Sequence, residues 1–524
     1  MSAPAREAPS ASLFSIVKAT LSKGLLRDVL VIASSTGVSR GLGLIRDMVI
    51  AHLFGAGAAF DAYTIAFTIP HMLRRLLAEG ALSSAFVPVY TETLTKKGQQ
   101  AANRFASNLI SVGLIFFPLL VLIGILTAPI YIPFLADGFS GEKLKLTVGL
   151  TRVTFAFIAF VGMAAIFMGI LNSHKNFFAP AFAPVAFNLG ILFAVIGLSS
   201  FLTTPIYSLA IGVLAGGLGM LLFQLPALHG KFQYQFAIDF KDEALRKLFM
   251  MMIPAVVGLA IFQINLLVDN KLASRLGDGA ISALQYATRL FQLPLGVFAV
   301  AVASAILPRL SVQVASKDSA GLSSTLQRGL KLAAFIVLPA MAGLLAMGEP
   351  AIRLLFEHGK FTPESTHLTF YALANFIPGL VGYGLAYVLT RAFYAMHDTK
   401  TPMLVGALTV ALNVALDYTL IGPMGVGGLA LATSLAGLFN VTLLFVILER
   451  RLELTLFKPL SSDLAKMAMS AALTGATAYS LYLGLKSHVS MEIVLVALPV
   501  GFGLLVYFGL AKLLRFYIDL VRHA

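Results

Sequence analysis

Stretches of about 20 apolar residues recur along this chain from about residue 28 to the C-terminus, with only short polar breaks between them. A helix of this length crosses a hydrocarbon layer about 30 Å thick and satisfies its own backbone hydrogen bonds there. Charged residues make up 12% of the sequence, whereas roughly 25% is usual for soluble domains. The pattern therefore predicts an all-α polytopic membrane protein.

The apolar stretches divide into about fourteen predicted spans when the chain is broken at glycine, proline and charge clusters. Lysine and arginine concentrate in alternate connections, which places both termini in the cytoplasm. This bias also explains the net charge of +14, and without a basic helix or recognition motif we expect no nucleic-acid partner. The spans are expected to begin at about residues 28, 60, 105, 147, 178, 205, 248, 279, 325, 364, 402, 427, 464 and 491.

The first six predicted spans align with the next six at an offset of about 220 to 224 residues. An even number of spans gives both copies the same orientation, so we expect two lobes related by a pseudo-two-fold axis along the membrane normal, with a cavity between them. The matching residues are Asp47 with Asp269, Gly55 with Gly277, Gly57 with Gly279, Pro70 with Pro294, Pro88 with Pro308, Pro118 with Pro339, Pro129 with Pro350, and Pro180 with Pro402.

The duplication and the spans together predict the domain organisation. A cytoplasmic segment (1–27) precedes an N-lobe of six spans (28–230), and a cytoplasmic linker (231–247) leads to a C-lobe of six spans (248–450). The last two spans and the C-terminus (451–524) lie outside the repeat.

Four arginine residues lie deep inside predicted spans. Counting 1.5 Å per residue from the span ends puts Arg40, Arg74 and Arg289 near the midplane, with Arg46 displaced outward. An arginine at the bilayer centre costs roughly 2.5 to 3.5 kcal/mol unless it faces a polar cavity. Because few acids lie nearby in sequence, we expect these guanidinium groups to bind an anion, and their fork geometry suits a diphosphate.

A structural role is the alternative for these charges. Asp47, Asp61 and Glu79 could neutralise the arginines and merely lock helices together. Arg75 and Glu79 are four residues apart on one helix face, and for this pair we favour the structural role. Arg40 and Asp47 also share a face, which keeps both interpretations open there.

A second polar group is expected near the outer ends of its helices. Asp269, Asn413, Asp417 and Thr433 fall at similar predicted depths, and oxygen ligands of this kind suit a hard cation such as Na⁺. Asn413 and Asp417 share one helix face. In the alternative, the two aspartates stay protonated or pair with basic neighbours, namely Lys271 or Arg275.

Catalytic motifs are missing from the sequence. It contains no cysteine, no metalloenzyme histidine spacing, no P-loop and no G-x-S-x-G elbow. We therefore expect a transporter rather than an enzyme, with no cofactor beyond the candidate Na⁺.

Several distinctive sequence blocks occur in order along the chain. The blocks are Ser39-Arg40-x-Leu42-Gly43-x-x-Arg46-Asp47, Leu53-Phe54-Gly55-Ala56-Gly57, Asp61-Ala62, Pro70-x-x-Leu73-Arg74-Arg75-x-x-Ala78-Glu79-Gly80-Ala81, Ala85-Phe86-Val87-Pro88, Ala287-Thr288-Arg289-Leu290, Leu293-Pro294-x-Gly296-Val297-Phe298, Leu307-Pro308 and Gly359-Lys360-Phe361. Together they resemble the MurJ (MviN) family of lipid II flippases, and the resemblance extends over nearly the whole chain.

This resemblance implies a MATE-like exporter fold of fourteen helices that works by alternating access in the bacterial inner membrane. It implies lipid II as substrate, membrane lipids as surroundings, a monomer, and a groove for the polyprenyl tail at about 464–514. Some relatives hold sodium at the positions of Asp269, Asn413, Asp417 and Thr433. Thr288 and Gln292 depart from relatives that have acids there, which weakens the case for a local switch on Arg289. The family's substrate-cavity positions match Arg40, Arg46, Asp47, Arg74 and Arg289.

Two other functions remain as alternatives. A drug or cation antiporter or a polysaccharide-unit flippase would share the fold, but carriers of cationic drugs need carboxylates at the midplane, where this chain has arginines. A membrane-embedded glycosyltransferase or ligase would need a catalytic acid or base in a sizeable outer loop, and the outer loops here are short.

Overall fold

A computed structural model describes residues 23–453, 457–514 and 516. All regular elements in these ranges are helices, which confirms the predicted all-α fold. Residues 1–22 of the expected cytoplasmic segment lie outside the described part of the chain. The elements are α2 Lys23–Phe54, α3 Ala58–Arg74, η1 Arg75–Leu82, α4 Ser83–Leu135, α5 Gly141–Phe155, α6 Phe157–Ser173, α7 Phe178–Leu198, α8 Tyr207–Leu228, α9 Glu243–Ala273, α10 Ala280–Pro294, η2 Leu295–Ala299, α11 Val300–Ala315, α12 Ser319–Phe356, α13 Pro363–Phe376, α14 Gly379–Ala395, α15 Lys400–Met424, α16 Val426–Leu452, α17 Phe457–Leu485 and α18 Glu492–Leu513.

Many of these helices are long and apolar enough to cross a bilayer. Among the described residues nine qualify, or ten if α13 and α14, bent by 44° at a short break, form one span. The expected total of fourteen stays a prediction. Several expected starts lie close to observed ones, as at α7, α15 and α16, whereas the expected start near residue 105 falls inside α4.

Local backbone chemistry explains the irregular helices. Gly98 interrupts α4 with φ 83°, a left-handed conformation that glycine adopts without steric cost. The π-helical turns η1 and η2 follow Pro70 and Pro294, whose rings remove an amide donor from the preceding helix. Both turns lie at equivalent places in the two repeats, and the pairs α3/α10 and α7/α15 also start at the predicted offset.

The described chain forms two compact units. Unit 1 comprises residues up to 49 together with 69–127 and 150–256, and unit 2 comprises 50–68, 128–149 and 257–524. Segments 50–68 and 128–149, which precede the second repeat in sequence, thus pack inside unit 2.

Within unit 1, small residues allow two helices to approach closely. A side chain at Gly190 on α7 would meet the backbone of Gly216 on α8 at 2.5 Å, so only glycine fits there. The extended linker after α8 is bound to α4: Asn108 Nδ2 donates to Asp239 O (2.8 Å), and Asp239 N donates to Asn108 Oδ1 (2.9 Å). This pairing satisfies linker backbone groups without secondary structure.

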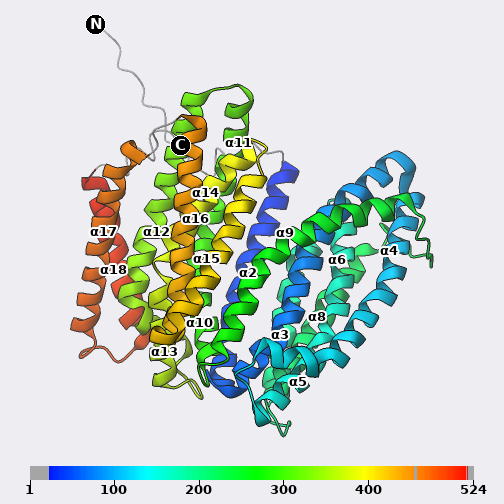
Figure 1. The fold of residues 1–524 in the computed structure, drawn as a ribbon, viewed down its shortest axis with the longest axis horizontal. Helices are drawn as coiled ribbons and strands as arrows, with labels where there is room; N and C mark the ends of the chain where they lie inside the picture. Colours follow the sequence, from blue (N-terminus) through cyan, green and yellow to red (C-terminus); the bar gives the residue numbers. More distant parts are fainter. Residues whose placement is uncertain (1–22, 454–456, 515, 517–524) are drawn as a thin grey trace. The chain divides into compact units, whose positions relative to one another are not determined.

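Within unit 2, α17 and α18 pack against α12 (Figure 1). Tyr507 on α18 is buried and donates to the carbonyl of Phe335 on α12 at 2.9 Å. Lys331 on α12 pairs with Asp463 on α17 at 2.5 Å. The last two helices are therefore fixed to the second repeat by buried apolar contacts together with specific polar ones.

Candidate functional site

The arginines expected to bind an anion are divided between the units. Arg40, Arg46 and Arg74 belong to unit 1, and Arg289 belongs to unit 2. Arg40 and Arg289 are exposed, and Arg74 is half-buried at the point where α3 passes into η1. π-Helical turns occur frequently at functional sites, and the position of Arg74 directly before η1 therefore favours a functional role for it.

Arg46 has identified partners. Its Nη2 donates to Asp47 Oδ1 at 2.7 Å, its Nε donates to the same oxygen at 3.0 Å, and its Nη1 donates to Asn188 Oδ1 at 2.8 Å. Asn188 on α7 also donates to the carbonyl of Ser39 at 3.1 Å. A neighbouring carboxylate therefore partly neutralises Arg46, although the sequence suggested too few acids for this.

The expected pair of Arg75 and Glu79 lies in η1. Arg75 is exposed, and the side chain of Glu79 lies outside the described residues.

Asp61 joins a first-repeat helix to the second repeat inside unit 2. Its carboxylate is fully buried and accepts hydrogen bonds from Gly279 N (2.7 Å), Ser282 N (2.9 Å) and Ser282 Oγ (2.6 Å). Lys143 lies 3.0 Å from Asp61 Oδ2 and 2.7 Å from Asp278 Oδ1. Asp61 thus closes the N-terminus of α10, where free amides and the helix dipole favour a negative charge. We refer to Asp61, Lys143, Asp278, Gly279 and Ser282 as the Asp61 network.

Further contacts join the same segments. Arg275 Nη2 pairs with Asp137 at 2.6 Å, and Lys271 lies 3.5 Å from the same carboxylate. The hydrogen bond from Arg275 is the main reason that the pKa of Asp137 is lowered. Lys360 N donates to the carbonyl of His52 at 2.9 Å. Short segments of the first repeat are therefore held against the second repeat at several points.

The candidate cation site gathers oxygen-bearing side chains in unit 2, of which Asn413 and Asp417 are buried and Asp269 and Thr433 half-buried. Asp417 is fully buried, and Asp269 accepts from Asn265 Nδ2 at 3.2 Å. The carboxyl groups of Asp269 and Asp417 lie close enough to share a hydrogen bond. One oxygen of each, Oδ1, is buried without a hydrogen-bond partner among the described residues. Because Lys271 and Arg275 contact Asp137, neither supplies the counter-charge that the alternative interpretation required.

The Asn413 side-chain amide has two possible orientations beside Asp417, and they differ in hydrogen bonding. With its nitrogen toward Asp417, it donates to Asp417 Oδ2 at 3.0 Å, and its oxygen accepts from Thr433 N. In the opposite orientation its oxygen faces acceptors only, while its nitrogen donates to Thr433 Oγ1 at 3.4 Å. Two adjacent buried carboxylates with partnerless oxygens need a proton or a cation. The residues present therefore fit a hard cation held by carboxylate, amide and hydroxyl oxygens.

Several polar residues of these clusters were not singled out in the sequence, among them Asn265, Asn188 and Lys143. Asn265 precedes Asp269 by one helical turn and shares its face, so the spacing could have indicated it. Asn188 and Lys143 carry no comparable signal, because their partners are distant in sequence.

Known proteins settle the family. The model of the family described as "Lipid II flippase MurJ" matches residues 50–499. The chain belongs to the MurJ family. Among curated MurJ proteins, a probable lipid II flippase MurJ of Vibrio cholerae is 36% identical over 473 residues, covering 88% of this chain and 90% of its own. A lipid II flippase MurJ of Burkholderia cenocepacia is 33% identical over 435 residues, covering 82% and 84%.

Solved structures agree with the MurJ assignment. A structure titled "Lipid II flippase MurJ, inward closed conformation" superposes with a TM-score of 0.78 and 30% identity, covering 94% of this chain and all of that one. An inward-facing MATE family multidrug transporter has a TM-score of 0.69 at 14% identity, with coverage of 79% and 94%, which shows a shared fold only. The resemblance to MurJ and the MATE-like fold are both confirmed.

Proposed function

We propose that this MurJ family chain is a lipid II flippase of the bacterial inner membrane, which moves the lipid-linked peptidoglycan precursor from the cytoplasmic to the outer leaflet. The observation that carries this proposal is the family match over residues 50–499, with curated lipid II flippases similar over most of the chain. A flippase is a transporter and leaves its substrate covalently unchanged.

The head group is proposed to be held by Arg40, Arg46, Arg74 and Arg289. Lipid II carries a diphosphate, and guanidinium groups bind phosphate oxygens bidentately without losing their charge. Arg40 and Arg289 are exposed on α2 and α10, and a charge at membrane depth is tolerated where it faces water, which supports a wet environment around them. Asp47 and Asn188 orient Arg46, and a bound diphosphate would compete for its donors.

The Asp61 network supports alternating access. It binds segments of the first repeat to the N-terminus of α10 through a fully buried carboxylate. Opening of this end would expose the Asp61 carboxylate and leave the amides of α10 without their acceptor. The closed arrangement is therefore favoured until other interactions replace these hydrogen bonds. We propose that this end lies on the outer side, on the expectation that both termini are cytoplasmic.

The cluster of Asp269, Asn413, Asp417 and Thr433 is proposed to bind Na⁺, with Asn265 as a further ligand. Its two buried carboxylate oxygens without partners support this assignment. A bound Na⁺ would offset one of the two negative charges of the pair, and it would favour the conformation in which the ligands converge. We further propose that the protein acts as a monomer.

Complementation of a flippase-depleted bacterial strain tests the substrate role of Arg74. We expect Arg74→Ala to abolish growth although the protein reaches the membrane at normal levels, because a fixed charge for the diphosphate is lost. The matched control is Arg328→Ala, an exposed arginine near the start of α12, which should support growth. Normal growth with Arg74→Ala would remove Arg74 from the mechanism.

A second measurement separates transport from chemistry. Purified protein in vesicles should move lipid II from one leaflet to the other without changing its mass. Conversion of lipid II to a new covalent product would favour the glycosyltransferase or ligase alternative.

A further inference from the structure

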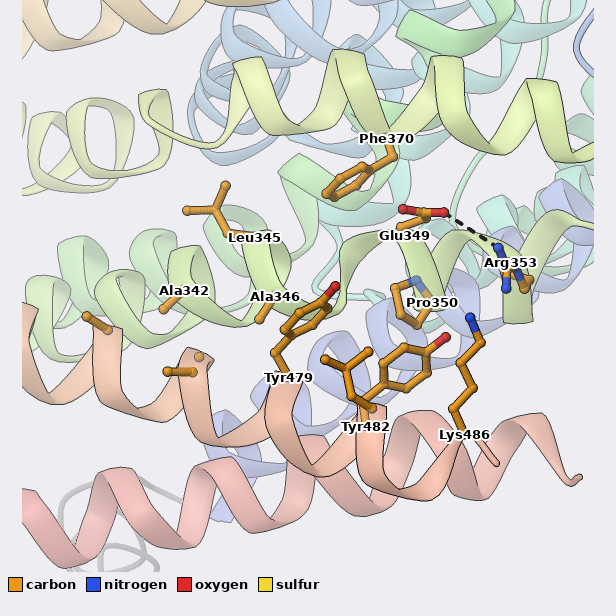
Figure 2. A pocket seen from close by; sticks show the side chains of 14 residues that line it. Ala342, Leu345, Ala346, Glu349, Pro350, Arg353, Phe370, Tyr479, Tyr482 and Lys486 are labelled. Carbon is orange, nitrogen blue, oxygen red and sulfur yellow. Dashed lines mark ion pairs between the residues drawn. The ribbon is translucent and has the colours of Figure 1, made fainter. Parts of the chain in front are cut away.

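A cavity of about 510 Å³ lies between α12 and α17, with Phe370 of α13 at its edge (Figure 2). The two helices run in the same direction, because Lys331 pairs with Asp463 near their starts and Ala342 lies beside Gly475 further along. The cavity opens beyond that close contact, toward the C-terminal ends of both helices. It therefore lies toward the same end of unit 2 as the Lys360–His52 contact, and none of its lining residues belongs to the Asp61 network or to the candidate cation site.

The lining changes from apolar to charged along the cavity. Ala342, Leu345, Ala346, Ala472 and Ala476 line one end. The other end is lined by Glu349, Pro350, Arg353, Tyr482 and Lys486, and Figure 2 shows Lys486 extending from α17 toward α12 on the side of Arg353. A ligand that fills both ends must itself have an apolar part and a charged part.

Two basic groups at the charged end have unused hydrogen-bonding capacity. Arg353 lies 3.5 Å from both Glu349 and Glu357, longer than a good hydrogen bond, and its buried Nε donates to no described residue. The ammonium of Lys486 forms no ion pair with any residue in the part of the chain that the structure describes. A phosphate would accept from both groups, and the nearby Tyr482 hydroxyl is a third donor.

The same end also presents acceptors. Glu349 contributes a carboxylate, and its ion-pair distances to Arg353 and His367 are both 3.5 Å. Because Pro350 has no amide hydrogen, the carbonyl of Ala346 loses its usual donor four residues ahead. These two acceptors suit a primary ammonium group beside the phosphate.

We propose that this cavity binds a diacyl phospholipid whose head group carries both a phosphodiester and a primary ammonium. The phosphate is held by Lys486 and Arg353, the ammonium by Glu349 and the Ala346 carbonyl, and an acyl chain lies along the alanine-lined end. A free phosphate would leave the apolar end unfilled. A polyprenyl chain would leave the charges at the other end desolvated and unpaired. The site shares no residue with the proposed head-group site, although α17 belongs to the segment 464–514 where the resemblance places the groove for the polyprenyl tail. The proposal does not depend on the flippase function.

The chain contains no tryptophan, which makes a single reporter available. Phe370→Trp places one indole at the cavity edge, and a phospholipid brominated on its acyl chains quenches it on contact. The brominated phosphatidylethanolamine is titrated into delipidated full-length protein in detergent. As a control, the indole is placed instead at Phe502 on α18, which is 47% exposed and does not line the cavity.

We expect saturable quenching of the indole at position 370 and only gradual quenching at position 502. In the reporter background, Lys486→Gln should weaken binding about 10-fold through loss of one charge-assisted contact, and Lys486→Arg should restore it. Lys466→Gln removes one charge from the other end of α17 and should leave binding unchanged. Arg353→Gln should also weaken binding, but Lys486→Gln is the primary test, because no described residue depends on it for an ion pair.

Competition identifies the ligand. Unlabelled phosphatidylethanolamine should displace the brominated lipid, whereas millimolar inorganic phosphate and diacylglycerol should not. The proposal is overturned if Lys486→Gln binds as tightly as the parent, or if brominated diacylglycerol binds equally well. Stronger displacement by undecaprenyl phosphate than by phosphatidylethanolamine would also overturn it and assign the cavity to the substrate tail.

Discussion

Asp61 caps α10 by accepting hydrogen bonds from both the backbone amide and the hydroxyl of Ser282, at 2.9 and 2.6 Å. The two residues lie in different repeats but in the same compact unit. A fully buried carboxylate is stable there because the helix N-terminus and Lys143 surround it with donors. The closure of this end of unit 2 is therefore centred on one acidic side chain.

Replacement of Asp61 should destabilise the closed arrangement. Asp61→Ala leaves Lys143 and the α10 amides without their buried acceptor, and loss of one partner of a buried ion pair costs about 3 to 5 kcal/mol. We expect a clearly lower thermal unfolding midpoint in detergent. Asp278→Asn, at a side chain that is 66% exposed, removes the other carboxylate on Lys143 and should shift the midpoint little. Equal shifts for both variants would contradict the assignment.

Sodium should stabilise the protein through the cluster around Asp417. At a concentration 100 times the dissociation constant, a cation that binds only the folded state adds about 2.7 kcal/mol. We expect NaCl, but not choline chloride at equal ionic strength, to raise the unfolding midpoint, and Asp417→Asn to abolish the difference. If Asp417→Asn retains the full sodium effect, the ion binds elsewhere.

Close helix packing should make Gly382 intolerant of any side chain. A Cβ at Gly382 on α14 would lie 2.5 Å from the backbone of Gly437 on α16, which cannot move aside as a side chain could. We expect Gly382→Ala to cost about 1 to 3 kcal/mol, measured as a lower unfolding midpoint. Gly343→Ala on α12 meets no atom within 4 Å and should be neutral or stabilising by up to about 1 kcal/mol. A neutral Gly382→Ala would show that α14 and α16 can separate at little cost.

Asp398, in the turn between α14 and α15, should contribute stability that depends on pH. Hydrogen bonds from the Thr401 hydroxyl and amide, followed by Arg451, lower the pKa of Asp398 to about 2. In the unfolded chain the pKa is about 3.9, so the contribution is complete above about pH 4 and is lost as the pH falls toward 2.

The measurement compares unfolding midpoints of the parent and Asp398→Asn between pH 7 and pH 2.5. The difference between the two unfolding midpoints should stay constant down to about pH 5 and become smaller below about pH 4. Thr401→Ala should reduce the pH-dependent stability that Asp398 contributes more than Arg451→Gln does. The reason is that the Thr401 hydrogen bonds are the larger cause of the lowered pKa of Asp398. A difference between the two midpoints that does not change with pH would exclude Asp398 as the titrating group.

Recurrent apolar stretches, proline positions and internal offset were enough to predict a helical membrane protein with a duplication. These features are local or periodic, so they can be recognised without contacts. Predicted depth grouped Asp269 with Asn413 and Asp417, because distance along a helix converts directly into expected depth, and the structure has these side chains close to one another. The MurJ resemblance was recognisable because its blocks are long and occur in order.

Sequence distance could not predict the partners of Asp61. The structural alternative paired it with an arginine, whereas it binds Lys143 and the start of α10. Nor could sequence distance predict that Asn188 would bind Arg46, or that α12 and α17 would enclose a charged cavity. Helix periodicity indicated which faces are apolar. Counting residues from the expected span ends gave the predicted membrane depth of each charge. Only the tertiary structure decided which charges meet, because side-chain pairing depends on the packing of helices from distant parts of the chain.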